Sequence, residues 1–183
     1  YRVGKLTFPS FVNIIPTTER SMIKIPSSGA LFNLKSIDFL RNSIPCSEEY
    51  NYSKIFIARG NNSKRDYNEE EIIDLLKQFN FQIILPEKYT IKEQASIFSN
   101  AEIIIGASGA AFSNIIFCRP NTKIICFMNY KIQISIFSTI AKYLNLKFQY
   151  LVGNNKYKEG KSKVQDAFQI DINELKMILY NLE

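Results

Sequence analysis

Residues 54–127 constrain the fold of this chain most, because four short apolar runs alternate there with helical patterns. None of these runs alternates apolar with polar residues, so each is expected to be buried on both faces, as a central parallel strand is. The runs cover residues 55–58, 83–85, 103–105 and 124–127. Strands and helices in this order predict a doubly wound α/β sheet.

The helical patterns between these runs carry start signals. Asn68 with Glu71, and Thr90 with Glu93, have the spacing of a capping box. A third helix is expected from the small-residue turn 106–109 to Phe117. Outside the block, helical patterns lie at Leu31, Leu34, Phe39 and Leu40, at residues 137–144 and behind an Asp171 cap, strands are expected at 5–8 and 148–152, and a mobile loop is expected at 154–163.

The absence of histidine narrows the chemistry. It excludes a Ser-His-Asp triad, a Cys-His dyad and His-ligated zinc within this chain. The three cysteines form no C-x-x-C pair, which favours reduced thiols and a cytoplasmic location. No apolar run approaches the roughly 20 residues of a membrane-spanning helix.

The net charge of +6 has two readings. It can reflect an anionic partner, such as a nucleotide, a polyanionic glycan, nucleic acid or a membrane surface. It can equally reflect composition, since Lys, Asn and Ile are frequent throughout. The basic residues are scattered and no aromatic platform accompanies them, so nucleic acid is not the expected partner.

Ligands of an open α/β sheet bind outside the carboxyl ends of its strands, and three groups follow strands here. In the loop 59–65, Arg59, Lys64 and Arg65 can contact a diphosphate, or the loop can simply be a solvated basic one. Glu87 follows the second run and can bind ribose hydroxyls. For Glu93, the capping role is favoured over a binding role.

The third group is the turn from strand into helix at residues 106–111. Its small residues let the backbone approach an anion at a helix N-terminus, although a tightly packed turn explains them as well. Asn114, one turn further on, can face the site or solvent. The candidate residues of this group are Gly106, Ser108, Gly109, Ala110, Ala111 and Asn114. No D-x-D pair is present to chelate a metal–diphosphate, so no metal site is expected.

Several of these segments together resemble the capsular-polysaccharide-type glycosyltransferases of family 61. The matching segments are Ile57-Ala58-Arg59, Arg65, Asn68-Glu69, Leu85-Pro86-Glu87, Glu93-Gln94, Phe98, residues 101–106, Gly109-Ala110, Asn114 and Phe117. Residues 166–171, followed by a helix, resemble the tail of the same family.

The resemblance implies the C-terminal, donor-binding half of a GT-B enzyme with a Rossmann-like, mostly parallel sheet. Residues 1–50 would be a lead-in with one strand and one helix, and 51–183 the nucleotide-sugar-binding domain of a longer two-domain chain. Arg59 and Arg65 would bind the donor diphosphate, the 106–111 turn would present N–H groups to it, and Glu87 or Asn114 would place the nucleoside or sugar. The expected partners are a nucleotide sugar as substrate, a glycan acceptor and an N-terminal acceptor-binding half, with no metal and no further cofactor, at a cytoplasmic location that includes the inner face of the membrane.

One position departs from the resemblance. The family usually carries His-Gly-Ala where this chain has Ser108-Gly109-Ala110. Serine can donate a hydrogen bond, but it cannot carry a positive charge or shuttle a proton near pH 7. Two readings therefore stay open: a metal-independent glycosyltransferase domain, and a degenerate nucleotide-binding or partner-binding domain.

Overall fold

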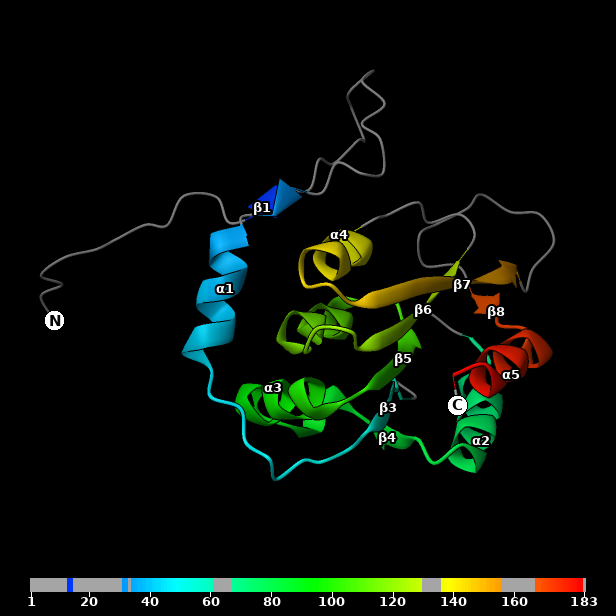
Figure 1. Ribbon diagram of the computed structural model, residues 1–183. Coiled ribbons are helices and arrows are strands. Elements are labelled where there is room, and N and C mark those ends of the chain that lie inside the picture. Colours follow the sequence, from blue (N-terminus) through cyan, green and yellow to red (C-terminus); the bar gives the residue numbers. More distant parts are fainter. Residues whose placement is uncertain are drawn as a thin grey trace, which may run out of the picture.

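A computed structural model describes residues 13–14, 31–32, 34–60, 67–129, 136–155 and 167–182 of the chain. Its main element is a six-stranded sheet with the strand order β4-β3-β5-β6-β7-β8 (Figure 1). Five strands are parallel and β8 runs antiparallel to β7. The strands are β3 (Lys54–Ile57), β4 (Gln82–Ile84), β5 (Ile103–Ala107), β6 (Lys123–Asn129), β7 (Lys147–Asn155) and β8 (Phe168–Gln169). The predicted doubly wound α/β sheet is confirmed.

Helices cover both faces of this sheet (Figure 1). One face packs against α1 (Leu34–Ser43), α3 (Ile91–Asn100), the 3-10 helix η2 (Ala110–Phe117) and α4 (Ile136–Tyr143). The other face packs against α2 (Glu69–Gln78) and α5 (Ile172–Tyr180). A short 3-10 turn, η1 (Pro86–Lys88), follows β4.

The apolar runs supply two hydrophobic cores at once, because successive side chains of a strand point to opposite faces. Ile104 belongs to the core on the α3 side, and its neighbours Ile103 and Ile105 belong to the core on the α2 side. Phe56 likewise lies on the α2 side and is fully buried. The expectation of strands buried on both faces is therefore correct for β3, β5 and β6, whereas β4 is an edge strand and is only partly buried.

The helix start signals have mixed outcomes. The Thr90 capping box is present: the Glu93 amide donates to Thr90 Oγ1 at 3.4 Å, and the Thr90 amide donates to Glu93 Oε2 at 2.6 Å. Asp171 caps α5 by accepting from the amides of Asn173 and Glu174. Asn68 is the N-cap residue of α2, as predicted, but its side chain makes no capping bond. It binds the backbone of Ile170, and its Nδ2 also donates to Glu71 Oε2 at 2.9 Å.

The segment before β3 differs in detail from the prediction. Leu31 lies in a short strand, β2 (Leu31–Phe32), which pairs antiparallel with β1 (Asn13–Ile14), and the helix begins only at Leu34. Ile37 is its buried side chain, whereas the expected apolar positions Leu34, Phe39 and Leu40 are exposed. The predicted strand at 5–8 lies outside the described residues, and the division of the chain near residue 50 stays a prediction.

Two other expectations concern the C-terminal third. The expected strand at 148–152 is part of β7, which continues to Asn155. It therefore includes the first two residues of the expected loop 154–163, and the rest of that loop lies outside the described residues. None of the helices in the described ranges is long and apolar enough to cross a bilayer.

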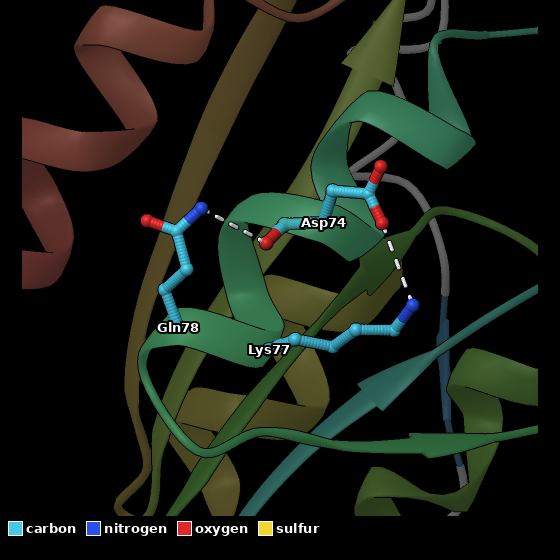
Figure 2. Close-up of polar contacts among 3 residues, drawn as sticks. All are labelled: Asp74, Lys77 and Gln78. Atoms are coloured by element: carbon cyan, nitrogen blue, oxygen red, sulfur yellow. Dashed lines mark hydrogen bonds and ion pairs between the residues drawn. The ribbon is translucent and has the colours of Figure 1, made fainter.

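The outer face of α2 carries polar contacts along the helix (Figure 2). Lys77 Nζ lies 3.4 Å from Asp74 Oδ1, and Gln78 Nε2 donates to the Asp74 carbonyl at 3.3 Å. Both charged side chains are more than half exposed, so this pair contributes little to stability. The helix is held chiefly by Ile72 and Leu76, which are fully buried against the sheet.

Candidate binding site at the carboxyl edge of the sheet

The strand order defines one switch point, between β3 and β5. The chain leaves β3 toward β4 on one side and later returns to β5 on the other. In open α/β sheets, ligands bind in the crevice outside the carboxyl ends of the strands at such a point. Ala58 and Arg59 follow β3 there, and Ser108 and Gly109 follow β5.

Arg59 lies across the turn that follows β5. Its Nη2 donates a hydrogen bond to the Ser108 carbonyl, and its guanidinium carbon lies 5.6 Å from the centroid of the Tyr67 ring. A Cβ atom at Gly109 would lie 3.3 Å from Arg59 Nη2. Glycine therefore leaves room for the guanidinium, and the structure brings together three of the predicted site residues: Arg59, Ser108 and Gly109.

The small residues of the turn also have a packing role. A Cβ atom at Gly106 would lie 2.9 Å from Ile57 Cβ, across the β3–β5 pair. Ser108 is buried, and its amide donates to the Phe127 carbonyl at 2.9 Å. The turn is thus tightly packed at Gly106.

Ala110 and Ala111 begin η2. This helix is of the 3-10 type, where an α-helix was expected. Its first i→i+3 bond runs from the Phe112 amide to the Gly109 carbonyl. The amides of Ala110 and Ala111 therefore precede the first bonded amide at this N-terminus.

Glu69 was not identified from the sequence as a site residue, although it is the first residue of α2. Its Oε1 accepts the Arg59 amide at 2.7 Å and the Tyr67 hydroxyl, and its Oε2 accepts the Gly60 amide at 3.0 Å. Burial, followed by this hydrogen bond, raises the pKa of Tyr67. Glu69 thus fixes the backbone just where β3 ends. The sequence signal was an acidic residue at a helix start directly behind a basic loop.

The Asn114 side chain is partly buried and is hydrogen-bonded to Gln94. Its Nδ2 donates to Gln94 Oε1 at 2.6 Å, and Gln94 Nε2 donates to the carbonyls of Pro86 and Tyr89, each at 2.9 Å. Asn114 is therefore tied, through Gln94, to the turn that carries Glu87. Glu87 itself is exposed on η1.

The order of the strands places this turn beside the Arg59 loop, since β4 and β3 are neighbours. The Ala58 amide also donates to the Ile84 carbonyl at 2.9 Å. Lys64 and Arg65 lie outside the described residues.

Glu93 has the capping role that was favoured. It also accepts a hydrogen bond from the Tyr50 hydroxyl at 2.5 Å. This bond is the main reason that the pKa of Tyr50 rises to about 12 and that the pKa of Glu93 falls below its usual value.

A cavity of about 750 Å³ lies at the opposite, amino edge of the sheet, lined by Lys54, Arg119 and Lys123 among others. Helices α2 and α5 end at this edge: Lys54 Nζ donates to the Phe79 carbonyl at 3.4 Å, and Lys123 Nζ to the Leu182 carbonyl at 2.8 Å. Arg119 Nη2 donates to Asn100 Oδ1 at 2.9 Å. Two of the three cations, Lys54 and Lys123, thus lie against the negative ends of helices.

Within the described part of the chain, no group of three or more Cys, Asp or Glu side chains has a metal-binding arrangement. A guanidinium and backbone amides are groups with which proteins bind anions. The fold and these residues define a doubly wound α/β domain with Arg59 and Glu69 at its switch point.

A comparison with known protein families shows to which family the domain belongs. A model of the family described as Glycosyltransferase 61 matches residues 12–125, more than half of the chain. The chain therefore belongs to glycosyltransferase family 61, as the sequence resemblance indicated. No curated protein matches the chain. The matched residues include Arg59, Glu69 and Gly109, and they end within β6, so the tail resemblance at 166–171 lies outside them.

Proposed function

We propose that this glycosyltransferase domain binds the nucleotide-sugar donor for sugar transfer in the synthesis of a capsular or other surface polysaccharide. The observation that carries the proposal is the placement of Arg59 at the switch point, where its guanidinium lies against the Ser108-Gly109 turn. An arginine at this place matches the geometry of a diphosphate, with which it can form paired hydrogen bonds.

The proposed mechanism is electrostatic. As the bond between sugar and diphosphate breaks, negative charge develops on the leaving nucleoside diphosphate. Arg59, together with Lys64 and Arg65, stabilises this charge, and the amides of Ala110 and Ala111 add fixed positive dipoles. Glu87 and Asn114 hold the nucleoside or the sugar. The resemblance to GT-B enzymes and the lack of a D-x-D pair support a reaction without a metal ion.

The acceptor side of the reaction belongs to another part of the protein in this proposal. An N-terminal half would hold the glycan acceptor and supply the base that activates its hydroxyl. The proposed location is the cytoplasm, including the inner face of the membrane, with which the domain would associate peripherally. Nucleic acid is not a proposed partner.

Calorimetric titration with UDP, GDP and CMP, without metal, tests the donor site. We expect saturable binding of one nucleotide, and an Arg59→Ala variant that binds it roughly 10- to 100-fold more weakly, as the loss of a charge-assisted hydrogen bond predicts. Arg119→Ala removes the same charge at the amino edge and should bind as the wild type does. Equal affinity of all three proteins would contradict the assignment.

Ser108 favours one second candidate, a degenerate nucleotide-binding or partner-binding domain. Serine stands where the resembled family usually carries histidine, and it is buried at the switch point. Transfer assays on the longer protein separate the two candidates. Transfer by the wild-type protein supports the enzyme. Transfer that appears only in a Ser108→His variant supports degeneration of the natural site.

A further inference from the structure

We infer that Tyr67, Asn68 and Glu69 form a positioning segment, which holds Arg59 in place from the C-terminal residues 168–170. The three side chains follow one another at the start of α2, and each contacts a different part of the molecule. Glu69 reaches the end of β3, Tyr67 reaches both Arg59 and Phe168, and Asn68 reaches Ile170.

Glu69 fixes the main chain of the loop that carries Arg59. Its carboxylate accepts the consecutive amides of Arg59 and Gly60, one on each oxygen. Gly60 has a φ of +64°, so the chain turns sharply at this point. Two hydrogen bonds to a charged acceptor therefore hold the sharpest part of the turn, and with it the start of the Arg59 side chain.

Tyr67 fixes the other end of that side chain. Its buried ring stacks on Phe168, with centroids 5.4 Å apart and an interplanar angle of 5°, and the Arg59 guanidinium also contacts it. Phe168 has little freedom to shift, since a Cβ atom at Gly153 would lie only 2.4 Å from its Cδ2. The position of the guanidinium thus depends on a ring supplied by β8.

Asn68 joins the same two regions through hydrogen bonds. Its Oδ1 accepts the Ile170 amide at 2.9 Å, and its Nδ2 donates to the Ile170 carbonyl at 3.0 Å. A side-chain amide offers one acceptor and one donor side by side, as a strand backbone does. A carboxylate would place an oxygen against the Ile170 carbonyl, so aspartate cannot replace it.

These contacts make the C-terminal segment part of the site, although the family match ends before it. Loosening residues 168–170 should release Tyr67 and Asn68 and, through Glu69, the backbone at Arg59. The expected effect on donor binding rests on the proposed function, whereas the expected effect on the backbone at Arg59 does not.

Amide hydrogen exchange of the whole 183-residue chain tests the positioning without any ligand. In Glu69→Ala we expect the amides of Arg59 and Gly60 to exchange at least about tenfold faster. Glu70→Ala changes an exposed glutamate of the same helical turn and should leave both amides as in the wild type. Ile105 in the central strand reports global opening, so the change in its exchange rate measures any overall loss of stability. In Glu69→Ala the amides of Arg59 and Gly60 should accelerate more than Ile105, and in Glu70→Ala all three should stay as in the wild type.

Asn68→Asp tests the connection to the C-terminal segment. We expect faster exchange at Ile170 and, several-fold, at Arg59 and Gly60, each beyond any change at Ile105. Faster exchange at Ile170 alone would overturn the connection, and unchanged protection of Arg59 in Glu69→Ala would overturn the role of Glu69.

Titration of the same variants with UDP, GDP and CMP adds the functional readout. Glu69→Ala and Asn68→Asp should weaken binding of the recognised nucleotide about tenfold, and Glu70→Ala should not. Wild-type affinity in Glu69→Ala would overturn the role in donor binding. If the wild-type chain binds none of the three, the donor proposal fails, and the exchange data still decide whether the segment positions Arg59.

Discussion

Ile57 and Gly106 face each other across β3 and β5, and the space between them admits no further carbon atom. A Cβ atom on Gly106 would lie 2.9 Å from Ile57 Cβ and 3.3 Å from Phe112 Cε2. This pair stands one step before the switch point, where the two strands deliver Arg59 and Ser108. At this junction the two strands therefore approach more closely than a side chain on Gly106 would allow.

Gly106→Ala is expected to destabilise the fold by about 1–3 kcal/mol, because the added methyl group overpacks the junction of two strands and η2. Urea unfolding measures the change. Gly109→Ala is the matched control: its Cβ would meet the end of the flexible Arg59 side chain at 3.3 Å, so its stability should stay within about 1 kcal/mol of the wild type. Equal losses in both variants would contradict this explanation.

Arg41→Ala should cost about 1–3 kcal/mol, because its guanidinium donates to the carbonyls of Ile116 and Cys118 at the end of η2. Arg119→Ala, which removes an exposed bond to Asn100, should change stability by no more than about 0.5 kcal/mol. Chemical denaturation of both variants checks the difference. A larger loss of stability in Arg119→Ala than in Arg41→Ala would contradict this explanation.

Gln94→Ala should destabilise the domain by about 1–2 kcal/mol, since it removes the partner of the Tyr89 carbonyl and of the Asn114 amide, and one of the two donors to the Pro86 carbonyl. Thermal unfolding gives the magnitude. Lys92→Ala, at an exposed position of the same helix, serves as the control and should be neutral. A neutral Gln94→Ala would show that the bridge between η2 and the Glu87 turn is dispensable.

The bond between Tyr50 and Glu93 predicts a pH dependence at both ends of the scale. The pKa of Glu93 is lowered, so its contribution is present above about pH 4.5 and is lost as the pH falls through its folded pKa. The pKa of Tyr50 is raised from 10.0 to about 12, so its contribution is present below pH 10 and is lost as the pH rises toward 12.

Tyr50→Phe is the variant that tests this bond. The difference between its tyrosine absorbance titration and that of the wild type should show one phenol with a pKa near 12. In unfolding experiments, the variant should differ most from the wild type between pH 5 and 10. A phenol that titrates near 10 would contradict the bond.

The centre of the sheet could be predicted from the sequence because β3, β5 and β6 lie in uninterrupted apolar runs, as strands buried on both faces do. The capping box of Thr90 and Glu93 could also be predicted, because both of its hydrogen bonds lie within a stretch of four residues. The strand ends followed directly, and with them the placement of Arg59, Ser108 and Gly109 at one edge.

The contacts that could not be predicted join residues far apart in the sequence. Asn68 is of a residue type that caps helices, but its side chain binds the backbone of Ile170, which lies 102 residues later in the sequence. Arg41 binds the carbonyls at the end of η2 from 75 and 77 residues away, a distance that local spacing cannot reveal. Glu69 was overlooked because two of its three partners are the backbone amides of Arg59 and Gly60, which residue types do not reveal.

The helix ends at the amino edge bear on the formal charge of +6. Lys54 and Lys123 lie against the carbonyl ends of α2 and α5, each of which carries roughly half a negative charge. Their long-range field is correspondingly weakened. A count of lysines and arginines thus overstates the positive potential of this edge of the sheet.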